Sequence, residues 1–123
     1  MRLLLDTQIL IWMVNGDRRF RLELSTTIAN ADSLHVSAVT AFEYSDLQSR
    51  GRIPVDEPFD ELVDRFDLEM EGYPVDCWRV AVQLPRIHRD PVDRMMIAHA
   101  IAGDFTLVTA DRTIRAYPVK SCW

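Results

Sequence analysis

Short apolar runs alternate with helical patterns along the whole chain, and this alternation constrains the fold more than any other feature. Residues 2–6, "RLLLD", are apolar up to the final acid, as expected of a strand that is buried on both faces. Further strands are predicted at residues 34–37, 73–75, 105–109 and 118–123. Helices are predicted between them, at residues 7–16, 19–31, 38–49, 58–70, 76–84 and 91–102. The pattern predicts an α/β fold with a mainly parallel central sheet and helices on both of its faces.

The length of the chain suits one hydrophobic core, so we expect residues 1–123 to form a single domain. The longest apolar stretch, "LLLDTQILIWMV", is interrupted by three polar residues and is shorter than the roughly 18 to 20 residues that span a bilayer. The early acid in "MRLLLD" does not suit a secretory signal. We therefore expect a soluble, cytoplasmic protein without a membrane partner.

Charge is distributed unevenly along the chain. The net charge of −5 argues weakly against a nucleic-acid partner. Residues 56–71, however, hold eight acidic residues and one arginine, and helical spacing sets these acids opposite the apolar face of the predicted helix 58–70. The acidic run is therefore interpreted as a solvated helix face. The rest of the chain is slightly basic and rich in arginine, which suits bidentate phosphate contacts, although a compositional bias explains the arginines equally well.

Four acidic residues are expected at one edge of the sheet. Asp6 ends the first predicted strand and Asp111 follows the fourth, whereas Glu43 and Asp93 lie in the first two turns of helices. The carboxyl ends of parallel strands and the N-termini of the following helices meet at the same edge. Glu43 and Asp93 also lie on apolar helix stripes, where an isolated charge is costly unless it meets a cation. Four acids without matching basic residues suggest a divalent metal, and such oxygen ligands suit Mg²⁺ or Mn²⁺.

Each acid also has a purely structural interpretation. Asp6 could cap a helix, Asp111 could form a turn, and Glu43 could pair with an arginine such as Arg94. Structural roles for all four would not explain why their predicted positions share one edge. The residues expected to bind the metal and to be catalytic are therefore Asp6, Glu43, Asp93 and Asp111.

The segment "HRDPVDRMM" contains two acids with different expected roles. Asp90 precedes Pro91, and proline is favoured at the first position of a helix, so Asp90 is predicted to be the N-cap. Asp93 then falls at the third helical position, where it could contribute to a weak capping box. Its apolar stripe favours the metal site instead.

No other catalytic set is evident, because the chain has neither a serine–histidine–acid pattern nor a glycine-rich phosphate loop. His99 lies inside an apolar helical segment and is interpreted as a core histidine with a hydrogen-bond partner. His88 and Arg89 could contact a phosphate or could simply lie in a surface loop. A carboxylate site that holds a divalent metal with open coordination positions suits phosphoryl chemistry.

Four segments, taken in order, carry a family resemblance: "LLLDTQILIW", "VSAVTAFEYSDLQSRGRI", "LPRIHRDPVDRMMIAHA" and "LVTADRTIRAYPVK". With the closing tryptophan they make the chain resemble the PIN-domain ribonucleases, and more closely the VapC-type toxins of prokaryotic toxin–antitoxin systems, nearly end to end. One departure is Gln8, where close relatives often have histidine. Gln8 can form hydrogen bonds but cannot titrate, and this departure leaves the acidic site intact.

The resemblance implies a three-layer α/β sandwich whose acidic metal site is formed by the four acids named above. It also implies that the hydroxyls of Ser37 and Thr109 lie close to that site. The implied activity is cleavage of RNA, dependent on Mg²⁺ or Mn²⁺, by a metal-activated water. Members of this family are usually homodimers. A cognate VapB-type antitoxin silences them with a tail that crosses the active-site groove, and its other half binds operator DNA.

Other families fit the sequence less well. A haloacid-dehalogenase-type phosphatase would need a second aspartate where this chain has Gln8, and a receiver domain would need a lysine beyond the fifth strand, whereas Lys120 falls within the last predicted strand. A non-catalytic regulatory domain with the same fold is a further alternative, against which the complete set of acids argues. A PIN nuclease outside toxin–antitoxin systems also remains open.

Overall fold

The computed structural model describes residues 1–123 and contains one five-stranded sheet in which all neighbouring strands are parallel. The strands are β1 (Arg2–Leu5), β2 (Ser33–Ser37), β3 (Leu68–Glu71), β4 (Thr106–Val108) and β5 (Ser121–Cys122). Their order is β3-β2-β1-β4-β5, which puts β1 at the centre. The three leucines of β1 are completely buried, because other strands flank them and helices cover both faces.

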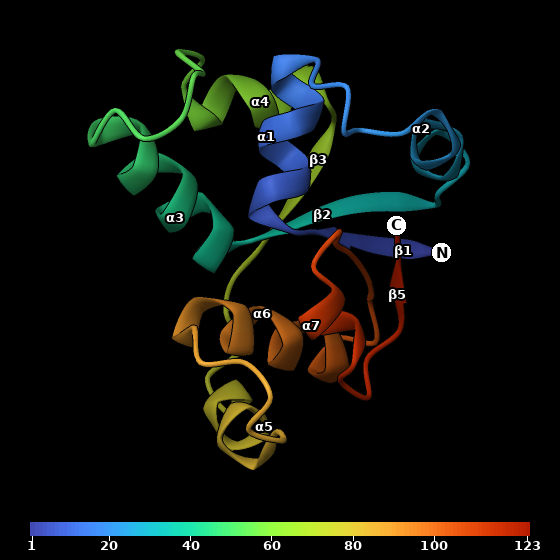
Figure 1. Cartoon of the computed structure of the whole chain (residues 1–123), viewed down its shortest axis with the longest axis vertical. Helices are drawn as coiled ribbons and strands as arrows, with labels where there is room; N and C mark the ends of the chain where they lie inside the picture. The colour runs from blue at the N-terminus through green and yellow to red at the C-terminus, as the bar shows by residue number, and fades with distance from the viewer.

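The helices form the two outer layers of a three-layer sandwich (Figure 1). They are α1 (Thr7–Asn15), α2 (Leu22–Ala29), α3 (Ala38–Ser49), α4 (Phe59–Arg65), α5 (Cys77–Gln83), α6 (Pro91–Ala102) and α7 (Arg112–Arg115). Leu3 and Leu5 belong to a core with residues of α1 to α4, whereas Leu4 belongs to a core with residues of α5 to α7. Successive side chains of the central strand thus pack into the cores on opposite faces of the sheet. The predicted α/β sandwich is confirmed, and none of its helices combines the length and apolar character that crossing a membrane requires.

Two predictions about residues 58–75 are wrong. The helix expected at residues 58–70 ends at Arg65, and the strand expected at residues 73–75 is instead β3 at residues 68–71. The chain turns at Asp67, whose φ of 52° is left-handed and cannot continue a right-handed helix. Leu68 then pairs with Leu34 of β2, and Met70, the last residue of the predicted helix, is 45% exposed. The spacing of apolar residues up to position 70 matched a helix, but pairing with β2 makes residues 68–71 a strand.

Other differences concern element ends and one short helix. The helix expected at residues 19–31 is shortened to α2, and the strand expected at residues 118–123 is shortened to β5. Helix α7 was not predicted, because four residues are too few to show a helical period. The predicted cap of α6 is confirmed, because Asp90 accepts a hydrogen bond at the start of this helix. The Ser37 side chain caps α3 in the same way and accepts a hydrogen bond from the N–H of Val39.

Candidate active site

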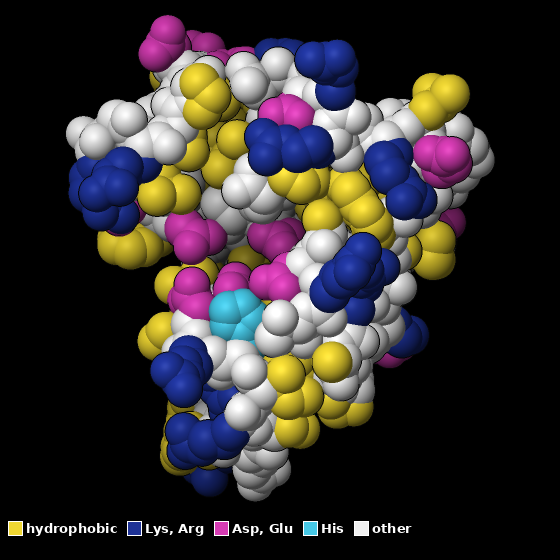
Figure 2. Space-filling model, in the orientation of Figure 1, with side chains coloured by type: hydrophobic (Ala, Val, Ile, Leu, Met, Phe, Trp, Pro, Cys, Tyr) yellow, Lys and Arg dark blue, Asp and Glu magenta, His cyan; other side chains and the backbone are white.

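A pocket of about 400 Å³ opens at the carboxyl edge of the sheet, next to the ends of β1 and β4 and lined by residues of α1, α3 and α6. Figure 2 shows acidic side chains gathered around this hollow, with lysine and arginine side chains distributed around them. Its acidic lining consists of Asp6, Glu43, Asp90, Asp93 and Asp111. The rest of the lining consists of Thr7, Gln8, Ile11, Trp12, Leu47 and Ala110. The structure therefore brings together all four acids expected from the sequence, and it adds Asp90.

Asp6 is held by contacts to both of its carboxylate oxygens. Its Oδ1 accepts a hydrogen bond from the N–H of Gln8 (3.1 Å), which makes Asp6 the N-cap of α1. Its Oδ2 accepts one from the hydroxyl of Thr109 (2.6 Å), and that hydroxyl oxygen accepts in turn from the N–H of Asp111 (3.1 Å). Thr109 therefore connects two of the acids directly, while its part in binding a metal stays a prediction.

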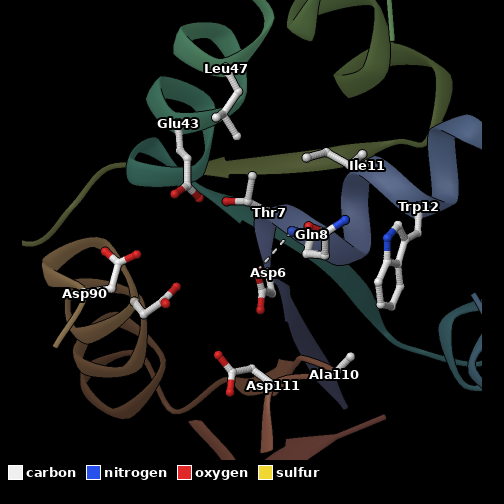
Figure 3. Close-up of a pocket in the computed structure, with 11 residues that line it drawn as sticks. Asp6, Thr7, Gln8, Ile11, Trp12, Glu43, Leu47, Asp90, Ala110 and Asp111 are labelled. Carbon is white, nitrogen blue, oxygen red and sulfur yellow. Dashed lines mark hydrogen bonds between the residues drawn. The ribbon is translucent and has the colours of Figure 1, made fainter. Parts of the chain in front are cut away.

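Asp111 and Asp90 are also N-caps. Asp111 Oδ1 accepts a hydrogen bond from the N–H of Thr113 (2.8 Å) at the start of α7, and Asp90 Oδ1 accepts one from the N–H of Val92 (2.9 Å) at the start of α6. An N-cap acid uses one oxygen for its helix. The second oxygen of Asp90 has no hydrogen-bond partner, whereas that of Asp111 lies 3.2 Å from Nε2 of His88. In Figure 3 the carboxylates of Asp6, Glu43, Asp90 and Asp111 lie around the same space.

Asp93 and Glu43 project from helices without capping them. Asp93 emerges from the stripe of α6 that carries Met96, Ile97 and Ala100, all of which are buried. Glu43 points from α3 toward Asp6 (Figure 3). The alternative that Glu43 pairs with Arg94 is wrong, because the Arg94 guanidinium donates to the backbone carbonyls of residues 81, 84 and 85.

The pocket disfavours negative charge on most of these groups. Burial raises the pKa of Asp93 to about 7, and repulsion from Asp90 and Asp6 adds to the effect. Burial also raises the pKa of Asp6 and of Glu43. Burial acts on Asp111 as well, but hydrogen bonds from the Thr113 N–H and from His88 outweigh it and lower the pKa.

No lysine or arginine lies within ion-pair distance of the five acids, and the basic side chain that contacts them is the imidazole of His88. Ionisation of these carboxylates is unfavourable, and they have no ammonium or guanidinium partner. Such a group of oxygens can be stabilised by a hard divalent cation. The donor set therefore suits Mg²⁺ or Mn²⁺, which accept oxygen ligands of this kind.

Ser37, which the resemblance also connected to the acids, contacts other groups. Its hydroxyl caps α3 and lies 2.8 Å from Nδ1 of His99. A role of Ser37 at the metal site thus stays a prediction for which the structure gives no contact. His99 is 2% exposed and hydrogen-bonded, which confirms its interpretation as a core histidine.

His88 is the residue of this site whose role the sequence left undecided. Its Nε2 lies 2.9 Å from Oδ2 of Asp93 and 3.2 Å from Oδ2 of Asp111. Asp90 was predicted only as a cap. The sequence signal that could have placed both His88 and Asp90 at the site was their position just before α6. The start of that helix lies at the sheet edge where the other acids meet.

A second histidine–carboxylate group lies between β2 and β3. His35 Nδ1 is 2.7 Å from Oε1 of Glu71 and 3.5 Å from Oε2 of Glu69, and its Nε2 is 2.6 Å from the Ser33 hydroxyl. Both ring nitrogens of this buried histidine already have partners. The group is therefore interpreted as a cross-strand contact that secures the edge strand β3.

Comparisons with known proteins agree with this fold. The family model described as "PIN domain" matches residues 3–120. Ribonuclease VapC22 from Mycobacterium tuberculosis is 32% identical over 119 residues, covering 93% of this chain and 90% of that protein. Among solved structures, VapBC2 from Rickettsia felis bound to a promoter DNA fragment has a TM-score of 0.72 at 18% identity, covering 99% of this chain and 98% of that one. VapC20 from Mycobacterium tuberculosis, described as a Sarcin-Ricin loop cleaving toxin, has a TM-score of 0.63 at 14% identity, covering 93% of each chain.

Proposed function

The chain belongs to the PIN-domain family, and on this premise we propose that it is a VapC-type toxin, an endoribonuclease that hydrolyses RNA phosphodiester bonds with Mg²⁺ or Mn²⁺. The observation that carries the proposal is the convergence of acids from separate elements in one pocket, with no lysine or arginine to neutralise them. The ribonuclease to which the chain is 32% identical supports RNA as the substrate class.

The acids expected to hold the cation are Asp6, Glu43, Asp93 and Asp111. When bound, a divalent cation supplies positive charge for phosphate oxygens and acidifies an attacking water. The protein's own part is to hold the carboxylates in place before the substrate arrives. The Thr109 hydroxyl fixes the carboxylate of Asp6, and the N–H groups at the starts of α1 and α7 favour the charged forms of Asp6 and Asp111.

The surface next to the pocket supports a phosphate-bearing substrate. Arg89 precedes Asp90 and Arg112 follows Asp111, and both arginines are exposed. Neither appears among the ion pairs of the structure. Exposed guanidinium groups that are free of carboxylate partners can contact the phosphates on either side of a scissile bond. This arrangement reconciles a net acidic protein with a polyanionic substrate.

The proposed partner is a VapB-type antitoxin, because the similar structures include toxin–antitoxin complexes, one of them on promoter DNA. A basic residue from its tail could offset the charge of the acidic pocket, and contact with operator DNA would be made through the antitoxin. Reversing the charge of that tail residue should restore RNA cleavage by the complex. A complex that is already fully active would contradict this part of the proposal.

The test of the activity combines cleavage with metal binding. The purified protein is incubated with structured and single-stranded RNAs in Mg²⁺, in Mn²⁺ and in EDTA, beside Asp93→Asn and the control Glu61→Gln on the exposed face of α4. We expect cleavage that EDTA abolishes, that Asp93→Asn lacks and that Glu61→Gln retains. Cleavage that survives EDTA would contradict the metal-dependent mechanism. Calorimetric titration with Mn²⁺ distinguishes a selective nuclease from a non-catalytic domain that does not bind the cation.

A further inference from the structure

His88 contacts two acids of the pocket, yet the proposed function gives it no role. Its Nε2 is within hydrogen-bond distance of Asp93, on α6, and of Asp111, which precedes α7. The backbone of His88 is fixed as well, because its N–H donates to the hydroxyl of Tyr117 (2.6 Å). The side chain is 19% exposed and is therefore held between two carboxylates from separate elements.

A backbone contact determines which ring nitrogen of His88 carries the proton. The N–H of Asp90 donates to Nδ1 of His88 (3.1 Å). A ring nitrogen that accepts a hydrogen bond has no proton of its own, so the neutral ring carries its proton on Nε2. The nitrogen that faces Asp93 and Asp111 is then a hydrogen-bond donor. It is not a metal ligand in this arrangement, because a ligating nitrogen needs a free lone pair.

We propose that His88 is a positioning residue: its Nε2–H donates to Oδ2 of Asp111, and the same nitrogen lies 2.9 Å from Oδ2 of Asp93, so that the ring holds these two carboxylates together. This inference rests on the proposed function, since the two acids are expected to bind the cation. Without the donor, two carboxylates on different elements would repel each other and separate. An imidazole N–H suits this task because a lysine or arginine in its place would bring a permanent positive charge that competes with the metal.

Two substitutions separate hydrogen bonding from packing. His88→Gln keeps an N–H donor on a side chain of similar reach, whereas His88→Leu keeps much of the volume but cannot donate. Arg86→Gln, at an exposed position in the same segment, is the matched control. Melting temperatures establish that each variant is folded. Mn²⁺ affinity is measured by calorimetry without RNA, so the result does not depend on finding the substrate.

We expect His88→Leu to weaken Mn²⁺ binding about tenfold or more, in line with the loss seen when partners of metal ligands are removed. His88→Gln should recover most of the affinity, and Arg86→Gln should equal the parent. The signals of the His88 ring in the ¹⁵N spectrum are assigned as those missing in His88→Gln. They should show the proton on Nε2 both in metal-free and in Mg²⁺-loaded protein.

Three outcomes would overturn the inference: parental affinity in His88→Leu, equal losses in both variants, or a proton on Nδ1 in the Mg²⁺-loaded protein. Parental affinity in His88→Leu leaves the proposed function standing. A parent protein that binds neither Mn²⁺ nor Mg²⁺ would instead overturn the metal-dependent function and this inference with it.

Discussion

The two aspartates at the start of α6 should respond in opposite ways to neutralisation. The pKa of Asp93 is raised to about 7 from an ordinary value of 3.8, because burial and acidic neighbours disfavour its charged form. This difference corresponds to a penalty of at most about 4 kcal/mol when Asp93 is ionised. The side chain is 25% exposed, so water screens part of the penalty. We expect Asp93→Asn to raise the free energy of unfolding by about 1 to 3 kcal/mol at pH 8 in EDTA.

The sign of this effect fixes its pH dependence. A carboxyl group with a higher pKa in the folded than in the unfolded protein binds its proton more tightly when folded. Ionisation therefore costs stability progressively as the pH rises from about 4 to about 7, which are the ordinary and the raised pKa of Asp93. Asparagine does not titrate. The variant and its parent should be nearly equal in stability near pH 4, and the variant should be more stable above pH 7.

Asp90→Ala should behave differently because Asp90 is the N-cap of α6. The variant loses the hydrogen bond from the Val92 N–H, which costs about 1 kcal/mol of stability. Removing its charge also relieves repulsion on Asp93, so the loss should be smaller at pH 8 than near pH 4.

Thermal melts across this pH range in EDTA, together with RNA cleavage in Mn²⁺, test both assignments. Asp93→Asn should be inactive because an amide does not supply the charge that holds the cation, whereas Asp90→Ala should keep much of the activity. The reasoning is refuted if Asp93→Asn is no more stable than the parent at pH 8. The assignment of roles is reversed if Asp93→Asn cleaves normally while folded Asp90→Ala does not.

Four further substitutions test other parts of the structure. Thr109→Val removes the donor to Asp6, so we expect a loss of about 1 kcal/mol in unfolding free energy and about tenfold weaker Mn²⁺ binding by calorimetry; unchanged affinity would speak against the contact. Arg89→Gln and Arg112→Gln should each weaken RNA binding and reduce its salt dependence in filter-binding assays, whereas a parental salt dependence would exclude phosphate contacts. Asp67→Gly should raise the unfolding free energy by about 1 kcal/mol in melting experiments, because glycine adopts the left-handed φ of 52° without strain, and an unchanged melting temperature would contradict this.

The fold was predictable where the local sequence pattern is strong and matches the burial that the structure shows. The continuous apolar run of β1 ends at Asp6, and the Asp90–Pro91 pair marks the first residue of α6. Prediction failed between Phe66 and Met70, where the helical spacing of apolar residues continues although the helix has ended. A single left-handed residue, Asp67, redirects the chain there. Strand β3 is stabilised by pairing with β2, a contact between distant parts of the chain that no local period reveals.

The acids of the site were predictable because strand ends and helix starts meet at one edge of a parallel sheet. His88 was not predictable in the same way, since it lies in a turn that has no period to orient its side chain. Its position depends on hydrogen bonds from its own N–H to Tyr117 and from the Asp90 N–H to its ring. Only the folded structure supplies these partners.

Capping and site formation are not alternatives for these acids. Asp6 and Asp111 were weighed as either structural or metal-binding residues, yet each uses Oδ1 to cap a helix while its Oδ2 is hydrogen-bonded to a neighbouring side chain. Asp90 also caps its helix while lining the pocket. The backbone N–H groups at three helix starts thus position carboxylates at the same edge, and they lower the cost of placing negative charges side by side.

Asp93 and Glu43 receive no such N–H group, because both lie beyond the caps of their helices. Burial raises the pKa of both, and that of Asp93 reaches about 7. By contrast, the capping acid Asp111 keeps a lowered pKa, although burial outweighs the cap at Asp6. A bound cation should therefore stabilise the charged forms of the three acids whose pKa is raised, Asp6, Glu43 and Asp93. The helix caps hold Asp6, Asp90 and Asp111 in place without metal. Asp93 and Glu43 have no backbone N–H to offset their negative charge, and this charge contributes to the affinity for a cation.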